Sequence, residues 1–219
     1  MADRAQVDIS RYSFDEFIAF VFDRNATPDT PVSDAWYSKI ELTFDPQRIC
    51  DYYTRLFRNP RFLLERFSKT QLEEGFWAIQ GGIYDCSVQA AIWIPELPFA
   101  AREECVRSML NLFSDLFALE PLETAPYMWW DGLCFDWDSG NRKRERGGED
   151  LLMQDVMFQT LSRILELDSD SCQDSALHGL GHLHHPETEQ LVRSYVECHP
   201  LLTKERREYA FAAARFDVL

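Results

Sequence analysis

Helix-start signals recur along this sequence, and apolar residues at helical spacing follow each one. Ser13 to Glu16 and Ser68 to Gln71 both have the spacing of a capping box, in which two side chains satisfy backbone N–H groups at the start of a helix. Asp45-Pro46 is another such signal, because proline fits the first turn of a helix. The apolar residues that follow lie three and four positions apart, as on one buried helix face. The sequence therefore predicts an all-α fold.

The expected helices cover most of the chain, and one segment leaves its type open. Asn25 to Trp36 contains two prolines and is expected to be a loop. Ile83 to Ile94 lies between a glycine pair and Pro95 and fits either a buried helix or a strand; helix is favoured because its neighbours are helical. Apolar spacing predicts helices over 13–24, 46–57, 60–67, 68–79, 98–119, 150–167, 171–183, 186–198 and 203–215.

A glycine-rich and charged segment divides the chain. We expect an N-terminal helical region at 1–138, a flexible charged loop at 139–150 and C-terminal helices at 151–219, with the two helical regions packed as one unit. The bases between Arg142 and Arg146 are embedded in an acidic protein. They are therefore interpreted as a solvated linker, or as an internal partner for acidic residues, rather than as a nucleic-acid site.

The segment Ala176 to Pro186, followed by Leu191, Val192 and Tyr195, resembles a HEAT-type helical repeat. The resemblance covers 171–200 and implies a helical hairpin, in which Gly179 allows the paired helix to approach and leucines fill the space between the helices. No second copy of the pattern is present. The fold is therefore expected to be an irregular helical bundle or a degenerate HEAT-like stack of helical hairpins.

All five histidines lie between His178 and His199. His178 and His182 are one helical turn apart and could face one metal ion. His184 and His185 could add ligands from the turn, and zinc suits imidazole nitrogen. However, Gly179 stands where the H-E-x-x-H signature needs glutamate, and no acid lies between 176 and 186 to complete a ligand set. Ordinary surface and turn positions are favoured, and no metal or cofactor is predicted.

Acidic residues dominate the charge balance. The formal net charge is −15, and the range 85–138 holds ten acids against two bases, a net of −8. Such a surface repels nucleic acid and anionic membranes and attracts basic proteins. The N-terminus lacks an apolar signal core and no apolar run of membrane-spanning length occurs, so a cytoplasmic protein with cysteines kept as buried free thiols is expected.

Aromatic residues accompany the acids just before the charged loop. Adjacent tryptophans on a helix point about 100° apart, so that one of them is expected to be partly exposed beside the acids. The candidate partner-binding residues are Trp129, Trp130, Asp131, Asp136, Trp137 and Asp138.

The sequence contains no catalytic signature: G-x-S-x-G, G-x-G-x-x-G and the P-loop motif are all absent. In general character the chain resembles bacterial toxin-immunity proteins, which implies a non-enzymatic inhibitor that presents an acidic, tryptophan-bearing surface to a basic protein such as a toxin domain. One alternative is a HEAT-like adaptor that holds a protein or peptide in a groove. Another is a metal-dependent enzyme that uses His178, His182 and His184.

Overall fold

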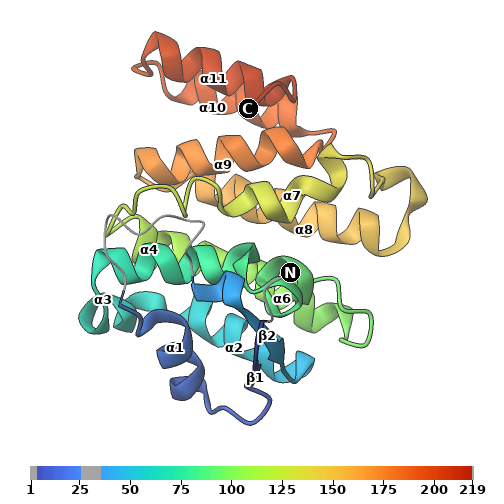
Figure 1. Cartoon of the computed structure of the whole chain (residues 1–219). Coiled ribbons are helices and arrows are strands. Elements are labelled where there is room, and N and C mark those ends of the chain that lie inside the picture. The colour runs from blue at the N-terminus through green and yellow to red at the C-terminus, as the bar shows by residue number, and fades with distance from the viewer. Residues whose placement is uncertain (1–3, 26–35, 219) are drawn as a thin grey trace. The chain divides into compact units, whose positions relative to one another are not determined.

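Helices make up most of the computed structural model, which describes residues 4–25 and 36–218 (Figure 1). The all-α prediction is confirmed: the described residues form eleven α-helices and two short strands. The loop expected at 25–36 lies almost entirely outside the described residues. The chain divides into two compact units, Met1–Ala125 and Pro126–Leu219.

Local capping explains where the first helices begin. In α1 (Phe14–Phe22) and α4 (Lys69–Trp77), Ser13 and Ser68 form the predicted capping boxes. The Asp45 side chain accepts a hydrogen bond at the start of α2 (Pro46–Arg58). The remaining helices of the first unit are α3 (Leu63–Arg66), α5 (Val88–Ala91) and α6 (Phe99–Leu112).

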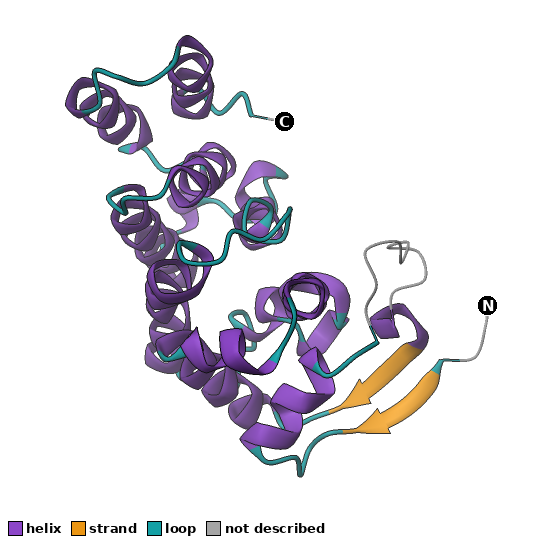
Figure 2. Cartoon of the chain, turned by 90° about the vertical axis from the view of Figure 1, so that its left-hand side faces the viewer, coloured by secondary structure: helices purple, strands orange, loops and turns teal. Residues whose placement is uncertain are grey.

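Two local features of the first unit differ from the expectation. Strand β1 (Ala5–Asp8) pairs in parallel with β2 (Ile40–Thr43), and neither strand was predicted, because four residues carry too little periodicity (Figure 2). The ambiguous range 83–94 contains no strand, and its helical part is limited to a 3₁₀ turn at Tyr84–Cys86 and the single turn of α5.

The second unit consists of helices α7 (Trp129–Asp138), α8 (Gly148–Leu165), α9 (Asp170–Leu183), α10 (Thr188–Cys198) and α11 (Lys204–Ala214). Helix α9 is the centre of this unit and packs mainly against α7, α8 and α11, whereas α10 packs mainly against α11. Helix α7 therefore belongs with the C-terminal helices, although it lies within the predicted N-terminal region 1–138.

Gly179 makes a close helix contact with a different partner from the one expected. A Cβ atom at Gly179 would lie 2.5 Å from Trp130 Cβ and 2.9 Å from Leu161 Cδ2. The glycine therefore admits α7 and α8 to the surface of α9, and not the following helix α10. This packing brings α7, with its acids, over the histidine-bearing helix.

The cysteines are free thiols, but the expectation that all of them are buried is wrong for one. Cys198 is exposed, and the other five are buried. Among the described residues, no helix combines the length and the apolar character that crossing a membrane requires.

Candidate functional site

Helix α9 carries two histidines on the face that it turns toward α7. His178 and His182 are one turn apart, and their rings meet edge to face with centroids 4.6 Å apart. His184 caps the end of the helix in the left-handed conformation, with φ 54°. The change of backbone direction at His184 separates its ring from the row formed by the two helical histidines.

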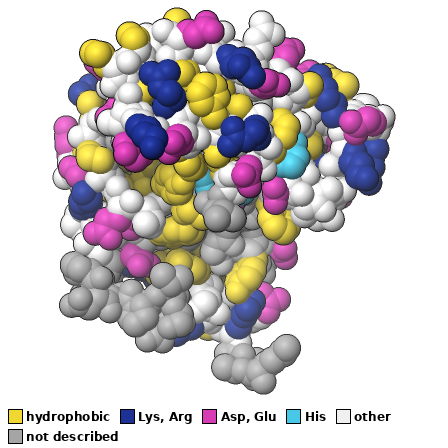
Figure 3. All heavy atoms as spheres, turned by 90° about the horizontal axis from the view of Figure 1, so that it is seen from above, with side chains coloured by type: hydrophobic (Ala, Val, Ile, Leu, Met, Phe, Trp, Pro, Cys, Tyr) yellow, Lys and Arg dark blue, Asp and Glu magenta, His cyan; other side chains and the backbone are white. Residues whose placement is uncertain are grey.

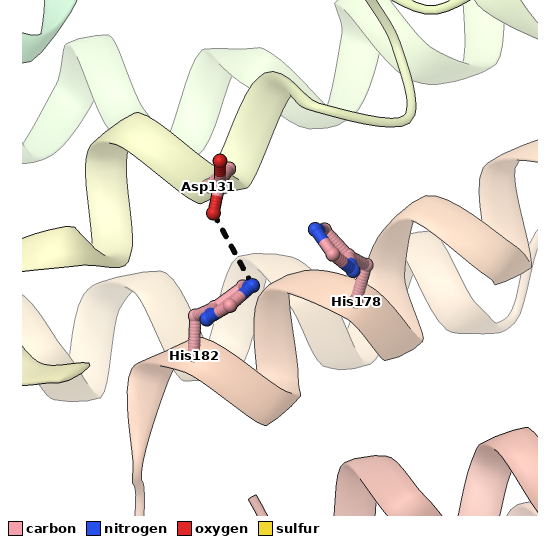
Figure 4. Close-up of side chains that lie close together, drawn as sticks. All are labelled: Asp131, His178 and His182. Atoms are coloured by element: carbon pink, nitrogen blue, oxygen red, sulfur yellow. Dashed lines mark ion pairs between the residues drawn. The ribbon is translucent and has the colours of Figure 1, made fainter. Parts of the chain in front are cut away.

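Asp131 of α7 joins the two histidines to form a three-residue cluster. The sequence had given no indication that this acid lies beside them. Its Oδ1 atom lies 3.2 Å from His182 Nε2. Asp131, His178 and His182 each offer one ligand atom, and these atoms all lie within 4.8 Å of one another (Figure 4). The acid comes from another helix, so no local spacing in the sequence pointed to it.

His178 is held in a buried aromatic setting. Its side chain is 1% exposed, it stacks on the Tyr127 ring at 4.5 Å, and its Nδ1 atom lies 2.8 Å from the Tyr209 hydroxyl. The Tyr209 hydroxyl is in turn 2.7 Å from that of Tyr127. Burial, together with the nearby His182, lowers the pKa of His178 to about 4. This imidazole is therefore neutral at pH 7.

His182 lies between two carboxylates. Its Nε2 faces Asp131, and its Nδ1 is 3.6 Å from Asp138 Oδ1. The same Asp138 oxygen lies 3.4 Å from His184 Nε2, while the His184 ring stacks on Phe216 at 4.6 Å. His184 thus contacts Asp138 rather than the Asp131 cluster. In the set of candidate ligands, Asp131 takes the place given to His184.

The structure corrects the expectation of an exposed tryptophan. Trp129 and Trp130 are fully buried, and Trp137 is 5% exposed. They are buried because α7 is covered by α9, with Trp130 seated over Gly179. The exposed aromatic residue of α7 is instead Phe135. Nothing in the local sequence distinguished it from the buried tryptophans.

Asp136 differs from the other candidate acids because a base of this chain neutralises it. Arg142 Nε donates to Asp136 Oδ2 at 3.0 Å, and the same guanidinium contacts Asp150 at 2.9 Å. Arg144 pairs with Asp155 in the same way. These bases of the 139–150 segment thus act as internal partners for acids, which was one of the two interpretations given to them.

No protein-family model, curated protein or solved structure matches this chain. The geometry and chemistry of its own residues are therefore the guide to its function.

Proposed function

We propose that the second unit is a non-enzymatic binding module that presents an acidic stripe on α7 to a basic protein partner, as an immunity-type inhibitor would. The observation that carries this proposal is a stripe made of Asp131, Phe135 and Asp138, defined here as the α7 stripe. These residues are four and three positions apart and so share one face of the helix. Their exposed fractions are 40%, 51% and 44%.

The chemistry of the α7 stripe fits an arginine or lysine of a partner. A guanidinium can stack on an aromatic ring while its N–H groups donate to neighbouring carboxylates. Asp131 faces His182, and Asp138 faces both His182 and His184. Both carboxylates are also partly exposed, so the guanidinium or ammonium group of a basic partner can reach them.

Matched variants can test the proposal, because Asp136 lies on the same helix outside the stripe. Asp138→Asn and Asp136→Asn change the net charge equally, but only the first alters the stripe. We expect affinity capture from native cells to retain a basic protein with the wild type and with Asp136→Asn. Asp138→Asn and Phe135→Ser should weaken its binding at least tenfold, and added salt should slow its association with the wild type.

Two results would contradict the α7 stripe as the binding face. One is equal affinity of the wild type, Phe135→Ser and Asp138→Asn for the captured protein. The other is a loss with Asp136→Asn as large as the loss with Asp138→Asn, which would indicate a dependence on net charge alone.

A second candidate, the groove-binding adaptor, is favoured by a pocket of about 400 Å³ on the C-terminal helices. Figure 3 views the second unit from the side on which α10 and α11 lie in Figure 1, and it shows apolar side chains exposed among basic and acidic ones. The pocket is lined by Glu189, Arg193, Phe211, Ala214, Arg215 and Phe216. Peptide display against the wild type and Phe211→Asp tests this candidate: peptides selected by both proteins alike would exclude the groove.

A further inference from the structure

In both histidines of α9, the Nδ1 atom faces one group of the protein and the Nε2 atom points away from it. In His178, Nδ1 is held by the Tyr209 hydroxyl at 2.8 Å; in His182, Nδ1 faces Asp138 at 3.6 Å. The Nε2 atom of each ring remains for other contacts. For His182 that atom faces Asp131, and Figure 4 shows both rings extending from α9 toward this carboxylate.

Neither Nε2 atom has a hydrogen-bond partner within the described part of the chain, and both atoms are buried. For His182 the 3.2 Å approach to Asp131 is close enough for an ion pair, but its geometry does not make a hydrogen bond. His178 is 1% exposed. A buried polar nitrogen without a partner is unfavourable, and such an atom calls for a specific explanation.

We propose that Asp131, His178 and His182 bind one divalent transition metal ion of the Zn²⁺ type. Two imidazole nitrogens and one carboxylate oxygen form a donor set suited to zinc, iron, nickel or copper, whereas calcium and magnesium require mainly oxygen donors. A bound ion would supply the partner that both buried Nε2 atoms lack.

The separations fit such an ion after small side-chain rotations. Zinc lies about 2.0–2.1 Å from its ligands, which places tetrahedral ligand atoms about 3.3 Å apart. The Asp131–His182 pair already has this separation, at 3.2 Å. The largest separation in the cluster is within 4.8 Å, so closure needs movements on the order of 1 Å.

The outer contacts are those that metal-bound histidines usually have. A ligating histidine generally donates its second ring N–H to a carboxylate or another acceptor, which fixes the tautomer and orients the ring. The Tyr209 oxygen can accept from His178 at 2.8 Å, and Asp138, 3.6 Å from His182 Nδ1, comes within hydrogen-bond distance after a small side-chain rotation. Because Asp131 is 40% exposed, the ion could enter at that edge, where water would complete its coordination.

This site does not depend on partner binding by the α7 stripe, and the chain offers matched controls. The test titrates metal-free protein without a histidine tag, using Zn²⁺ followed by calorimetry and Co²⁺ followed by its visible absorption. The wild type should bind one equivalent of each ion. Asp131→Asn and His182→Gln should bind more than 100-fold more weakly, and Tyr209→Phe about 10- to 100-fold more weakly.

Asp136→Asn and His199→Gln are the controls, since one removes a carboxylate of α7 outside the cluster and the other a histidine outside it. Both should bind as the wild type does. The partly exposed Asp131 and His182 are the main test positions, because their variants should fold, as melting curves can verify; His178→Gln adds the buried ligand.

The proposal is overturned if the wild type takes up no stoichiometric ion. It is equally overturned if folded Asp131→Asn and His182→Gln retain wild-type affinity, since the thiols or other side chains would then hold the metal. A loss in His199→Gln matching that in His182→Gln would also refute it. His178→Gln should lose the metal but keep the α7 stripe intact. The binding of a basic partner can therefore still be measured with this variant.

Discussion

Gly179 is the position where one added methyl group should disturb the second unit most. In Gly179→Ala the new Cβ would lie 2.5 Å from Cβ and 2.8 Å from Cγ of Trp130, and 2.9 Å from Leu161 Cδ2. Trp130 is fully buried and its Cβ moves only with the backbone of α7, so the helices would have to separate. Overpacking costs about 1–3 kcal/mol, and contacts this short indicate the upper end. Alanine recovers about 1 kcal/mol through helix propensity, leaving a net loss of about 2 kcal/mol.

Gly181→Ala provides the matched control on the same helix. It gains the same helix propensity, and its new Cβ would lie 2.4 Å from Cγ2 of Val218. However, this methyl group belongs to a residue outside any helix, so it can shift without separating two helices. Thermal unfolding followed by tryptophan fluorescence should place the midpoint of Gly179→Ala about 4–8 °C below that of the wild type, because 1 kcal/mol corresponds to about 2–4 °C at this size. Gly181→Ala should change much less. An unchanged midpoint for Gly179→Ala, or an equal fall for Gly181→Ala, would refute the reasoning.

Three further expected outcomes concern the metal, the Glu73 carboxylate and the buried His185. Zn²⁺ at about 100 times its Kd should stabilise the wild type by about 2.7 kcal/mol, and a thermal-shift assay should show most of this gain lost in Asp131→Asn. Glu73→Gln should lower the free energy of unfolding by about 2 kcal/mol in urea titrations, because the carboxylate accepts from the backbone N–H groups of residues 123, 124 and 125 at 2.8–2.9 Å. Burial lowers the pKa of His185, so as pH falls below about 6.5 the unfolded state binds this proton first. The free energy of unfolding should therefore be smaller at pH 5 than at pH 7, and His185→Gln should reduce that difference.

A different result would contradict each of these three expectations. An equal zinc shift in Asp131→Asn would remove the proposed ligand. An unchanged urea midpoint in Glu73→Gln would show that these hydrogen bonds to the backbone of residues 123–125 contribute little to stability. If the wild type and His185→Gln lost the same stability between pH 7 and pH 5, another group would be responsible.

Asp131 belongs both to the α7 stripe and to the proposed metal site. The effect of zinc on partner binding can therefore distinguish the two proposals. A bound cation would neutralise part of the charge that the α7 stripe offers to a basic partner. If both proposals hold, zinc should weaken partner binding by the wild type but not by His178→Gln, which keeps the stripe intact. If only the stripe functions, zinc should have no effect on either protein.

Periodicity and capping by themselves determined that this chain is helical, because those signals are local. The serines at 13 and 68 fix helix starts through hydrogen bonds to residues three positions away, and the structure has both starts. The short strands β1 and β2 escaped prediction because a four-residue parallel pair depends on a partner far along the chain.

The candidate site depended on tertiary packing. The spacing of His178 and His182 indicated that they share a helix face. The sequence between 176 and 186, however, holds no acid that could complete a set of metal ligands. Gly179 admits Trp130, and this contact brings α7 and its Asp131 to the histidines. The same packing buries the tryptophans and leaves Phe135 exposed. Local sequence thus determined which residues share a helix face, whereas contacts between distant helices decided which faces meet.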